Sequence, residues 1–450
     1  MKNSILSIFC LFAVVVILLT VCGCTHSNES QKSAEDFQIY TNSEQSIQSG
    51  NSNSNKLRIT SAEDFSDGFA WIKVYTKELS DDKVTLDIDH QRSALIDLNG
   101  NIQFYLDEKI TNIGTKNPNG YKSGICSVED DNENQYILDT NGKIILSSEK
   151  DGFSTILDYG DGYIAVENCI NDLHSIKYTV SIYDKEGKII KNEWLASDNT
   201  FRSVSYCGEG VFKCSDLNQN EEFFNAKASK SFSLENPYKL YDNYSGGLCI
   251  VKSKDSWTNP TYKLMDNGGN QTEINLNGNL VLHRDNWLVF QDDNDLILYD
   301  TLSGKDRVLY NSGNNISATI VGYENGMFLI SIKQEDVQNK FWFTLLDTNG
   351  KEEFAPIEGS ASAFSCDRIV CSNEGVYSKP FLVYDSKGNK ISVPENYYIV
   401  MGRSSVFNDN MLAVTNSLNF SINATVNYVD VNGKLMFEND KIDNQRAKDE

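Results

Sequence analysis

Histidine, cysteine and acidic side chains are the groups through which this chain could perform acid–base, nucleophilic or metal chemistry. It has 4 histidines and 10 cysteines among 450 residues, and no CxxC pair or Cys/His cluster has the spacing of a zinc site. A GxSxG elbow, a phosphate-binding loop, an HExxH helix and a dinucleotide fingerprint are also missing. His90 and His174 fall in variable stretches between predicted strands, and His283 lies just before an apolar strand. We therefore predict no catalytic residue, no metal and no cofactor.

The cysteines are better explained as core residues than as reactive groups. Cys126 and Cys249 occupy the position that Ala70 holds in an equivalent apolar run, where a small apolar side chain fits a core. Seven cysteines lie beyond Cys24, and an odd number rules out a complete set of intramolecular disulfides. Two pairs flank apolar runs, and their disulfide state is left open: Cys207 with Cys214, and Cys366 with Cys371.

A turn signal repeats along the chain. Two apolar residues followed by Asp or Asn occur nine times, from Leu95-Ile96-Asp97 to Tyr428-Val429-Asp430, with a mean step of about 42 residues. In seven of the nine, a glycine follows three positions after the acid. Asp at the first position of a turn accepts backbone N–H bonds and Gly at the fourth tolerates positive φ, so each signal predicts a hairpin. Calcium loops are not expected, because the spaced oxygen ligands are missing.

A second signal alternates with the hairpins: a glycine or polar residue followed by a short apolar run, as in Gly68 followed by Phe69-Ala70-Trp71-Ile72. Short apolar runs bounded by turn residues indicate strands buried on both faces. Between each hairpin acid and the next run there is room for two strands and a loop, so each unit is expected to hold four strands, the apolar one first. That is the pattern of a propeller blade, whose innermost strand is the most buried.

The repeat predicts an all-β fold, a β-propeller of about 8–9 four-stranded blades, with an open β-repeat array as the alternative. One weak unit, around Asn225, leaves the blade number open. The last unit stops soon after Lys434-Leu435-Met436-Phe437 and lacks a fourth strand, which Lys56-Leu57-Arg58-Ile59 could supply. Such an exchange would close the ring and remove exposed edges. We expect the β-repeat domain over residues 56–438 and a polar tail over 439–450.

The residue before each apolar run is acidic in six of the nine units: Asp67, Asp161, Glu209, Asp285, Asp367 and Asp409. If these runs are innermost and start together around a central channel, the six carboxylates would converge on one mouth and focus a negative potential there. A metal ion or a cationic ligand could bind in such a mouth. The alternative is that Asp-Gly and Asn-Gly pairs occur in each unit for turn geometry alone.

The first unit resembles the bacterial WG-repeat family. Its segment Phe65-Ser66-Asp67-Gly68-Phe69-Ala70-Trp71-Ile72-Lys73-Val74, followed by Ala94-Leu95-Ile96-Asp97-Leu98-Asn99-Gly100, is similar to that family's F-x-x-G-L-A-x-V-like strand and I-D-x-x-G-K-like hairpin. The likeness extends in weaker form from about residue 65 to 437. No Trp-Gly dipeptide occurs, so the chain is a divergent member. The resemblance implies a repeat scaffold, often on exported proteins, without catalytic residues.

The N-terminus has the order of a signal peptide: a basic start at Lys2, then an apolar run from Ile5 to Val21. The following Val21-Cys22-Gly23-Cys24 resembles a bacterial lipobox, in which a cysteine after a small residue takes a diacylglycerol. Cys24 fits better than Cys22, because the bulky Val21 precedes Cys22. We predict a signal peptide over 1–23 and lipid attachment at Cys24. The alternative is an uncleaved N-terminal helix, since about 17 apolar residues are the lower limit for spanning a bilayer.

Residues 24–55 are rich in Ser, Asn, Gln and Glu and have too few large apolar side chains to fold, so they are predicted to be a disordered tether. The formal net charge of −23 argues against nucleic acid and anionic lipid surfaces as direct partners, because both are polyanions.

The sequence as a whole predicts a monomeric lipoprotein held at the cell membrane through Cys24, facing the extracytoplasmic side. The repeat domain is expected to be a non-catalytic scaffold that binds an unknown protein or glycan of the cell envelope. The alternative is a glycan-active hydrolase or lyase on a propeller scaffold, which would need two carboxylates about 5 to 10 Å apart.

Overall fold

The computed structural model describes residues 59–437, apart from 76–90, 108, 114–120, 173–174, 198–202, 216–219, 235–236, 254–259, 314, 335–339, 373–380, 396, 401–405 and 417–425. The chain divides into two units, Met1–Gln38 and Ile39–Glu450, and every described residue belongs to the second. The predicted signal peptide, tether and C-terminal tail lie outside the described residues, as does Cys24.

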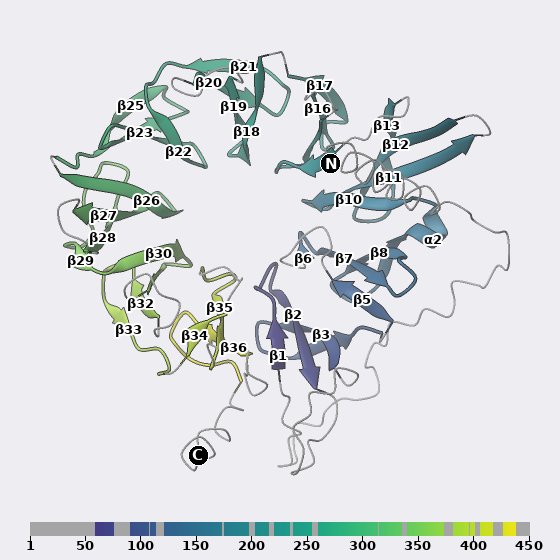
Figure 1. The fold of residues 1–450 in the computed structure, drawn as a ribbon, viewed down its shortest axis with the longest axis horizontal. Helices are drawn as coiled ribbons and strands as arrows, with labels where there is room; N and C mark the ends of the chain where they lie inside the picture. The colour runs from purple at the N-terminus through teal and green to yellow at the C-terminus, as the bar shows by residue number, and fades with distance from the viewer. Residues whose placement is uncertain are drawn as a thin grey trace, which may run out of the picture. The chain divides into compact units, whose positions relative to one another are not determined.

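The described residues form nine antiparallel sheets in chain order, here called blades 1 to 9, arranged in a ring (Figure 1). The strands of blades 1 to 4 are β1 (Ile59–Ala62), β2 (Phe69–Tyr75), β3 (Gln91–Asp97), β4 (Ile102–Tyr105); β5 (Ile110–Ile113), β6 (Tyr121–Lys122), β7 (Ile125–Asp130), β8 (Gln135–Asp139), β9 (Ile144–Ser147); β10 (Thr155–Gly160), β11 (Tyr163–Asp172), β12 (Ser175–Asp184), β13 (Ile189–Ser197); and β14 (Ser203–Tyr206), β15 (Val211–Ser215), β16 (Glu221–Asn225), β17 (Lys230–Ser233). The single short helix among the described residues, α2 (Ser148–Asp151), follows β9.

The strands of blades 5 to 9 are β18 (Tyr238–Ser245), β19 (Leu248–Ser253), β20 (Tyr262–Asp266), β21 (Gln271–Ile274); β22 (Asn279–Arg284), β23 (Trp287–Asp292), β24 (Asp295–Asp300), β25 (Lys305–Tyr310); β26 (Ile316–Glu324), β27 (Met327–Gln334), β28 (Phe341–Leu346), β29 (Ile357–Glu358); β30 (Ser360–Ser365), β31 (Arg368–Ser372), β32 (Leu382–Asp385), β33 (Lys390–Ile391); and β34 (Tyr398–Ile399), β35 (Met411–Thr415), β36 (Val426–Asp430). Blade 2 has a fifth short strand, β6, and blade 9 has three strands; the other seven have four.

This arrangement confirms the predicted all-β propeller and excludes the open array. The weak unit around Asn225 is a separate blade with four strands of its own. Its hairpin lacks the glycine, and Ser229 takes the positive φ instead, at 48°, while the Asn225 side chain accepts a backbone N–H as the aspartates do elsewhere. Its Oδ1 accepts the backbone N–H of Ala228 at 3.0 Å. The ring therefore has nine blades.

The apolar runs are the second strands of their sheets, so the prediction that they are innermost was wrong. Each sheet begins with a strand that precedes the apolar run, as β1 precedes β2. Figure 1 shows these first strands, such as β22, β26 and β30, on the inner side of the ring, with β25, β29 and β33 on the outer side. A second strand is buried on both faces by the neighbouring blades, as Cys249, Ile250 and Val251 show. Packing between blades, and not closeness to the centre, therefore explains why these strands are apolar.

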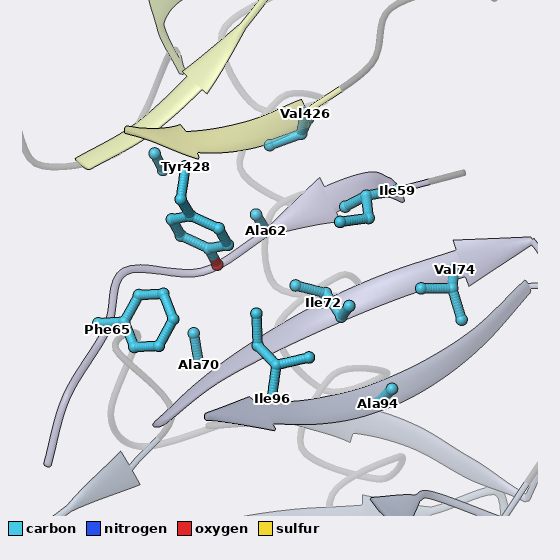
Figure 2. Packing of buried hydrophobic residues seen from close by; sticks show 11 residues of the cluster. Ile59, Ala62, Phe65, Ala70, Ile72, Val74, Ala94, Ile96, Val426 and Tyr428 are labelled. Carbon is cyan, nitrogen blue, oxygen red and sulfur yellow. The ribbon is translucent and has the colours of Figure 1, made fainter. Parts of the chain in front are cut away.

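Ring closure also differs from the predicted strand exchange. Ile59 begins β1, which pairs with β2 of the same blade, and residues 56–58 lie outside the described part of the chain. Blade 9 instead places its own C-terminal segment beside β36: Leu435 bridges to Val429, and the N–H of Met436 donates to the Tyr428 carbonyl at 2.9 Å. Side chains of β1 and β2 pack against Val426 and Tyr428 of β36 to complete the ring (Figure 2).

The predicted hairpins form as expected from their turn chemistry. In the hairpin of blade 7, Oδ1 of Asp347 accepts the N–H groups of Asn349 at 2.8 Å and Lys351 at 2.9 Å. Gly350 has a φ of 77° and donates to the Asp347 carbonyl at 3.0 Å. The same carboxylate bonds recur at the other hairpins that carry the glycine: Asp97, Asp139, Asp184, Asp266, Asp385 and Asp430.

These bonds favour the ionised carboxylate. The backbone N–H of Lys351 lowers the pKa of Asp347 from its ordinary value of 3.8. Burial raises the pKa of Asp97, but hydrogen bonds from Asn101 and Asn99 more than offset this and lower it. The pKa is lowered by the same balance at Asp266, Asp300 and Asp385.

The folded domain is therefore expected to lose stability in acid. A carboxylate with a lowered pKa in the folded state stabilises that state above its unfolded pKa, and the contribution is lost as the pH falls through the folded pKa. The free energy of unfolding, measured with urea, should decrease once the pH is lower than about 4. Asp347→Asn keeps the turn's acceptor oxygen and removes one titrating group, so its acid loss should be smaller. An equal loss in this variant would argue against the hairpin carboxylates as the cause.

Candidate functional site

The six acids of the predicted mouth lie in the turns between the first and second strands of blades 1, 3, 4, 6, 8 and 9. We call the nine equivalent turns the turn rim. Every one of these acids has a positive φ, between 49° and 60°. Asp tolerates this conformation better than most residues. Backbone geometry therefore accounts for part of the acidic pattern.

Three of these carboxylates accept a backbone N–H from the turn of the next blade. Oδ2 of Asp67 accepts the N–H of Gly124 at 3.0 Å. The Glu209 carboxylate accepts the N–H of Gly247 at 3.0 Å, and Oδ2 of Asp409 accepts the N–H of Gly68 at 2.7 Å. These acids thus join consecutive blades, a role that the sequence analysis did not predict.

The other three acids have different partners. Oδ2 of Asp285 accepts the phenol hydroxyl of Tyr323 in the next blade at 2.9 Å. Oδ2 of Asp161 lies 3.4 Å from Nζ of Lys227 in blade 4. Oδ2 of Asp367 lies 3.5 Å from a guanidinium nitrogen of its neighbour Arg368, and its side chain is 67% exposed. Asp367 is therefore more exposed than Asp161, whose side chain is 37% exposed.

Two further residues of the turn rim join blades and were missed by the sequence analysis. The Glu324 carboxylate accepts the N–H groups of Cys366 at 2.8 Å and Asp367 at 2.7 Å. Oγ of Ser245 accepts the N–H of Asp285 at 2.8 Å. Both residues stand one position earlier than the acids in the other units, directly before Asn325 and Gly246. A search for an acceptor at either of the two positions before the glycine would have found them.

The turn rim is thus chiefly a belt of hydrogen bonds between blades. Most of its carboxylates bind groups of the next blade, whereas Asp367 pairs with Arg368 of its own turn. No group of three or more His, Cys, Asp or Glu residues within the described ranges is arranged to hold a metal ion. Binding of a cationic ligand at the rim stays a prediction from the sequence.

His283 lies inside β22, within the joint between blades 5 and 6. Its side chain is buried, and Nδ1 lies 3.7 Å from Oδ2 of Asp242 in β18. The buried imidazole is thus part of the packing between β18 and β22. His90 and His174 lie outside the described residues.

Five of the seven cysteines that the structure describes are buried, and Cys169 and Cys366 are partly exposed. All seven that the structure describes are free thiols, including both pairs whose disulfide state the sequence left open. Cys126 and Cys249 are completely buried, and the indole N–H of Trp71 donates to Sγ of Cys126 at 3.3 Å. Burial raises the pKa of the Cys207 and Cys371 thiols to about 12. Thiols with such pKa values are poor nucleophiles at neutral pH.

No family model and no curated protein matches the chain. Solved structures to which the chain is similar include a post-proline cleaving enzyme from Rickettsia typhi, at 10% identity and a TM-score of 0.36, over 73% of this chain and 58% of that one. BamB from Moraxella catarrhalis matches at 9% identity and a TM-score of 0.27, over 70% and 80%. TolB from Acinetobacter baumannii matches at 13% identity and a TM-score of 0.23, over 65% and 77%. The chain spans less than two thirds of the Rickettsia enzyme, and such distant likenesses concern the fold alone.

Proposed function

We propose that this protein is a lipid-anchored scaffold on the extracytoplasmic side of the cell membrane, whose nine-bladed propeller binds a protein or glycan of the envelope. The observation that carries the proposal is the order of segments along the chain. An apolar run ends at Val21-Cys22-Gly23-Cys24, a polar stretch follows, and the first strand of the propeller begins at Ile59. This order suits an anchor, a tether and a folded domain held away from the lipid surface.

The hydrogen-bond partners of the turn-rim carboxylates favour a scaffold over a glycan-active enzyme. Catalysis on a glycosidic bond needs a pair of carboxylates free to face the substrate. On the turn rim, Asp67, Glu209 and Asp409 bind backbone N–H groups of neighbouring blades instead. The resemblance to WG repeats also favours a repeat scaffold. Within the described residues, no helix has the length and apolar character needed to cross a membrane.

The anchor is tested by substitution of the lipobox cysteine. Cys24→Ala should abolish metabolic labelling with radioactive palmitate and move the protein from the membrane fraction to the soluble fraction. Cys22→Ala is the matched control, because it changes the neighbouring cysteine and should keep full labelling. Labelling that persists in Cys24→Ala and disappears in Cys22→Ala would move the anchor to Cys22. If neither the natural protein nor any variant takes up the label, lipidation is refuted.

A further inference from the structure

The joint between blades 9 and 1, here called the seam, differs from the other eight joints of the ring in its connectivity. The blades follow one another in chain order, so a peptide segment links each blade to the next, but none links blade 9 back to blade 1. At the seam β1 lies against β36. Among the described residues, noncovalent contacts alone therefore hold the seam together.

Two hydrogen bonds, here called the closing bonds, connect blade 9 to the segment between β1 and β2. The hydroxyl of Tyr428 donates to the carbonyl of Glu63 at 2.5 Å. Oδ2 of Asp409 accepts the N–H of Gly68 at 2.7 Å, and this bond joins residues 341 positions apart in sequence. Both bonds are partly buried, so water can compete for their groups once the blades begin to separate.

An apolar core lies beneath the closing bonds. The ring of Phe65 meets that of Tyr428 edge to face, with centroids 4.8 Å apart, and Ile59 and Ala62 of β1 belong to the same core cluster as Val426 (Figure 2). β1 itself has only four residues and pairs with β2 through a bulged register. β1 thus pairs with β2 on one side and packs against β36 of blade 9 on the other.

We propose that the ring opens at the seam before the rest of the domain unfolds, and that the hydrogen bond from the Gly68 N–H to the Asp409 carboxylate helps to keep the seam closed. When any other joint separates, the linking peptide still restrains the two blades, so less conformational freedom is gained. Such local openings occur where a structure is least restrained. The proposed function places a tether in the chain before β1. Opening at the seam would then change the ring at the strand through which the domain is connected to its anchor.

Hydrogen exchange measured by mass spectrometry on the full chain tests the proposal. In the natural protein, the amides of β1 and β36 should exchange at least about 10-fold faster than those of β26 and β30, which meet at the linked joint between blades 7 and 8. Equal protection at the two joints would overturn the proposal. This result is independent of lipidation, because it is read from the propeller alone.

Asp409→Ala and Asp67→Ala form a matched pair of variants. Both residues have a positive φ, 49° and 55°, and both lose a carboxylate bond to a glycine N–H of the next turn, at the seam and at the linked joint between blades 1 and 2 respectively. Asp409→Ala should further accelerate exchange throughout β1, β2 and β36. Asp67→Ala should affect only the turns around residues 67 and 124. If exchange is accelerated over equally large regions in both variants, the seam does not open more readily than the other joints.

Discussion

Replacing Trp71 with alanine is expected to lower the free energy of unfolding by about 3–5 kcal/mol, the range for a large aromatic removed from a core. The Trp71 side chain is buried. Its ring is stacked on Tyr121 at a centroid distance of 5.7 Å and meets Phe104 edge to face at the same distance. It fills the joint between blades 1 and 2, so alanine would leave a cavity that these rigid neighbours cannot close.

Urea unfolding followed by circular dichroism would measure this loss. Trp71→Phe keeps an aromatic ring and should lose about 1–2 kcal/mol, less than alanine because the cavity is smaller. Leu302→Ala is a surface control, since Leu302 is 77% exposed and should change stability by less than about 0.5 kcal/mol. A loss below about 1 kcal/mol in Trp71→Ala would mean that the neighbouring side chains move to fill the cavity, so that the joint does not depend on this ring.

The second large effect is expected at Gly433, the last glycine of the repeating hairpins. Its φ is 81°, and a Cβ at this position would overlap the carbonyl oxygen of Ser392, in the segment after β33 of the preceding blade. Gly433→Ala therefore combines backbone strain with a collision that only a shift between blades can relieve. Backbone strain costs about 1–2 kcal/mol, and overpacking adds about 1–3 kcal/mol.

Gly124 offers a matched control for this substitution. Its φ is 78°, and a Cβ there would have nothing within 4 Å. Gly124→Ala should therefore lose only the strain, about 1–2 kcal/mol. The difference between the two variants measures the contact between the hairpin of blade 9 and blade 8. Equal losses in thermal or urea unfolding would show that this contact relaxes without cost.

Local turn chemistry is the part of the structure that the sequence determined most completely. The Asp-x-x-Gly hairpins satisfy their own hydrogen bonds within five residues, as Asp347 and Lys351 show, so no distant partner is needed to form them. Because these hairpins recur along the chain at a mean step of about 42 residues, the all-β class, the repeat and the approximate blade number followed from the sequence. Even Asn225, which lacks the glycine, makes its turn locally.

The sequence did not determine the order of the strands in a blade from the centre of the ring outward. An apolar run shows that a strand is buried on both faces, but in a propeller the second strand meets this condition as well as the first, because neighbouring blades cover both of its faces. Sequence periodicity records burial and carries no information on distance from the centre of the ring. The prediction that runs such as Phe69-Ala70-Trp71 are innermost was wrong for this reason.

Only the closed ring decides what the acids of the turn rim do. The sequence placed Asp67, Glu209 and Asp409 at equivalent positions, where either a ligand mouth or turn geometry could explain them. Their actual partners are N–H groups of the next blade, and for Asp409 that partner is 341 residues away. A bond of this kind depends on the angle and spacing between whole blades, to which the packing of Phe65 against Tyr428 contributes at this joint. The residue types were visible in the chain, but their partners exist only once the ninth blade meets the first.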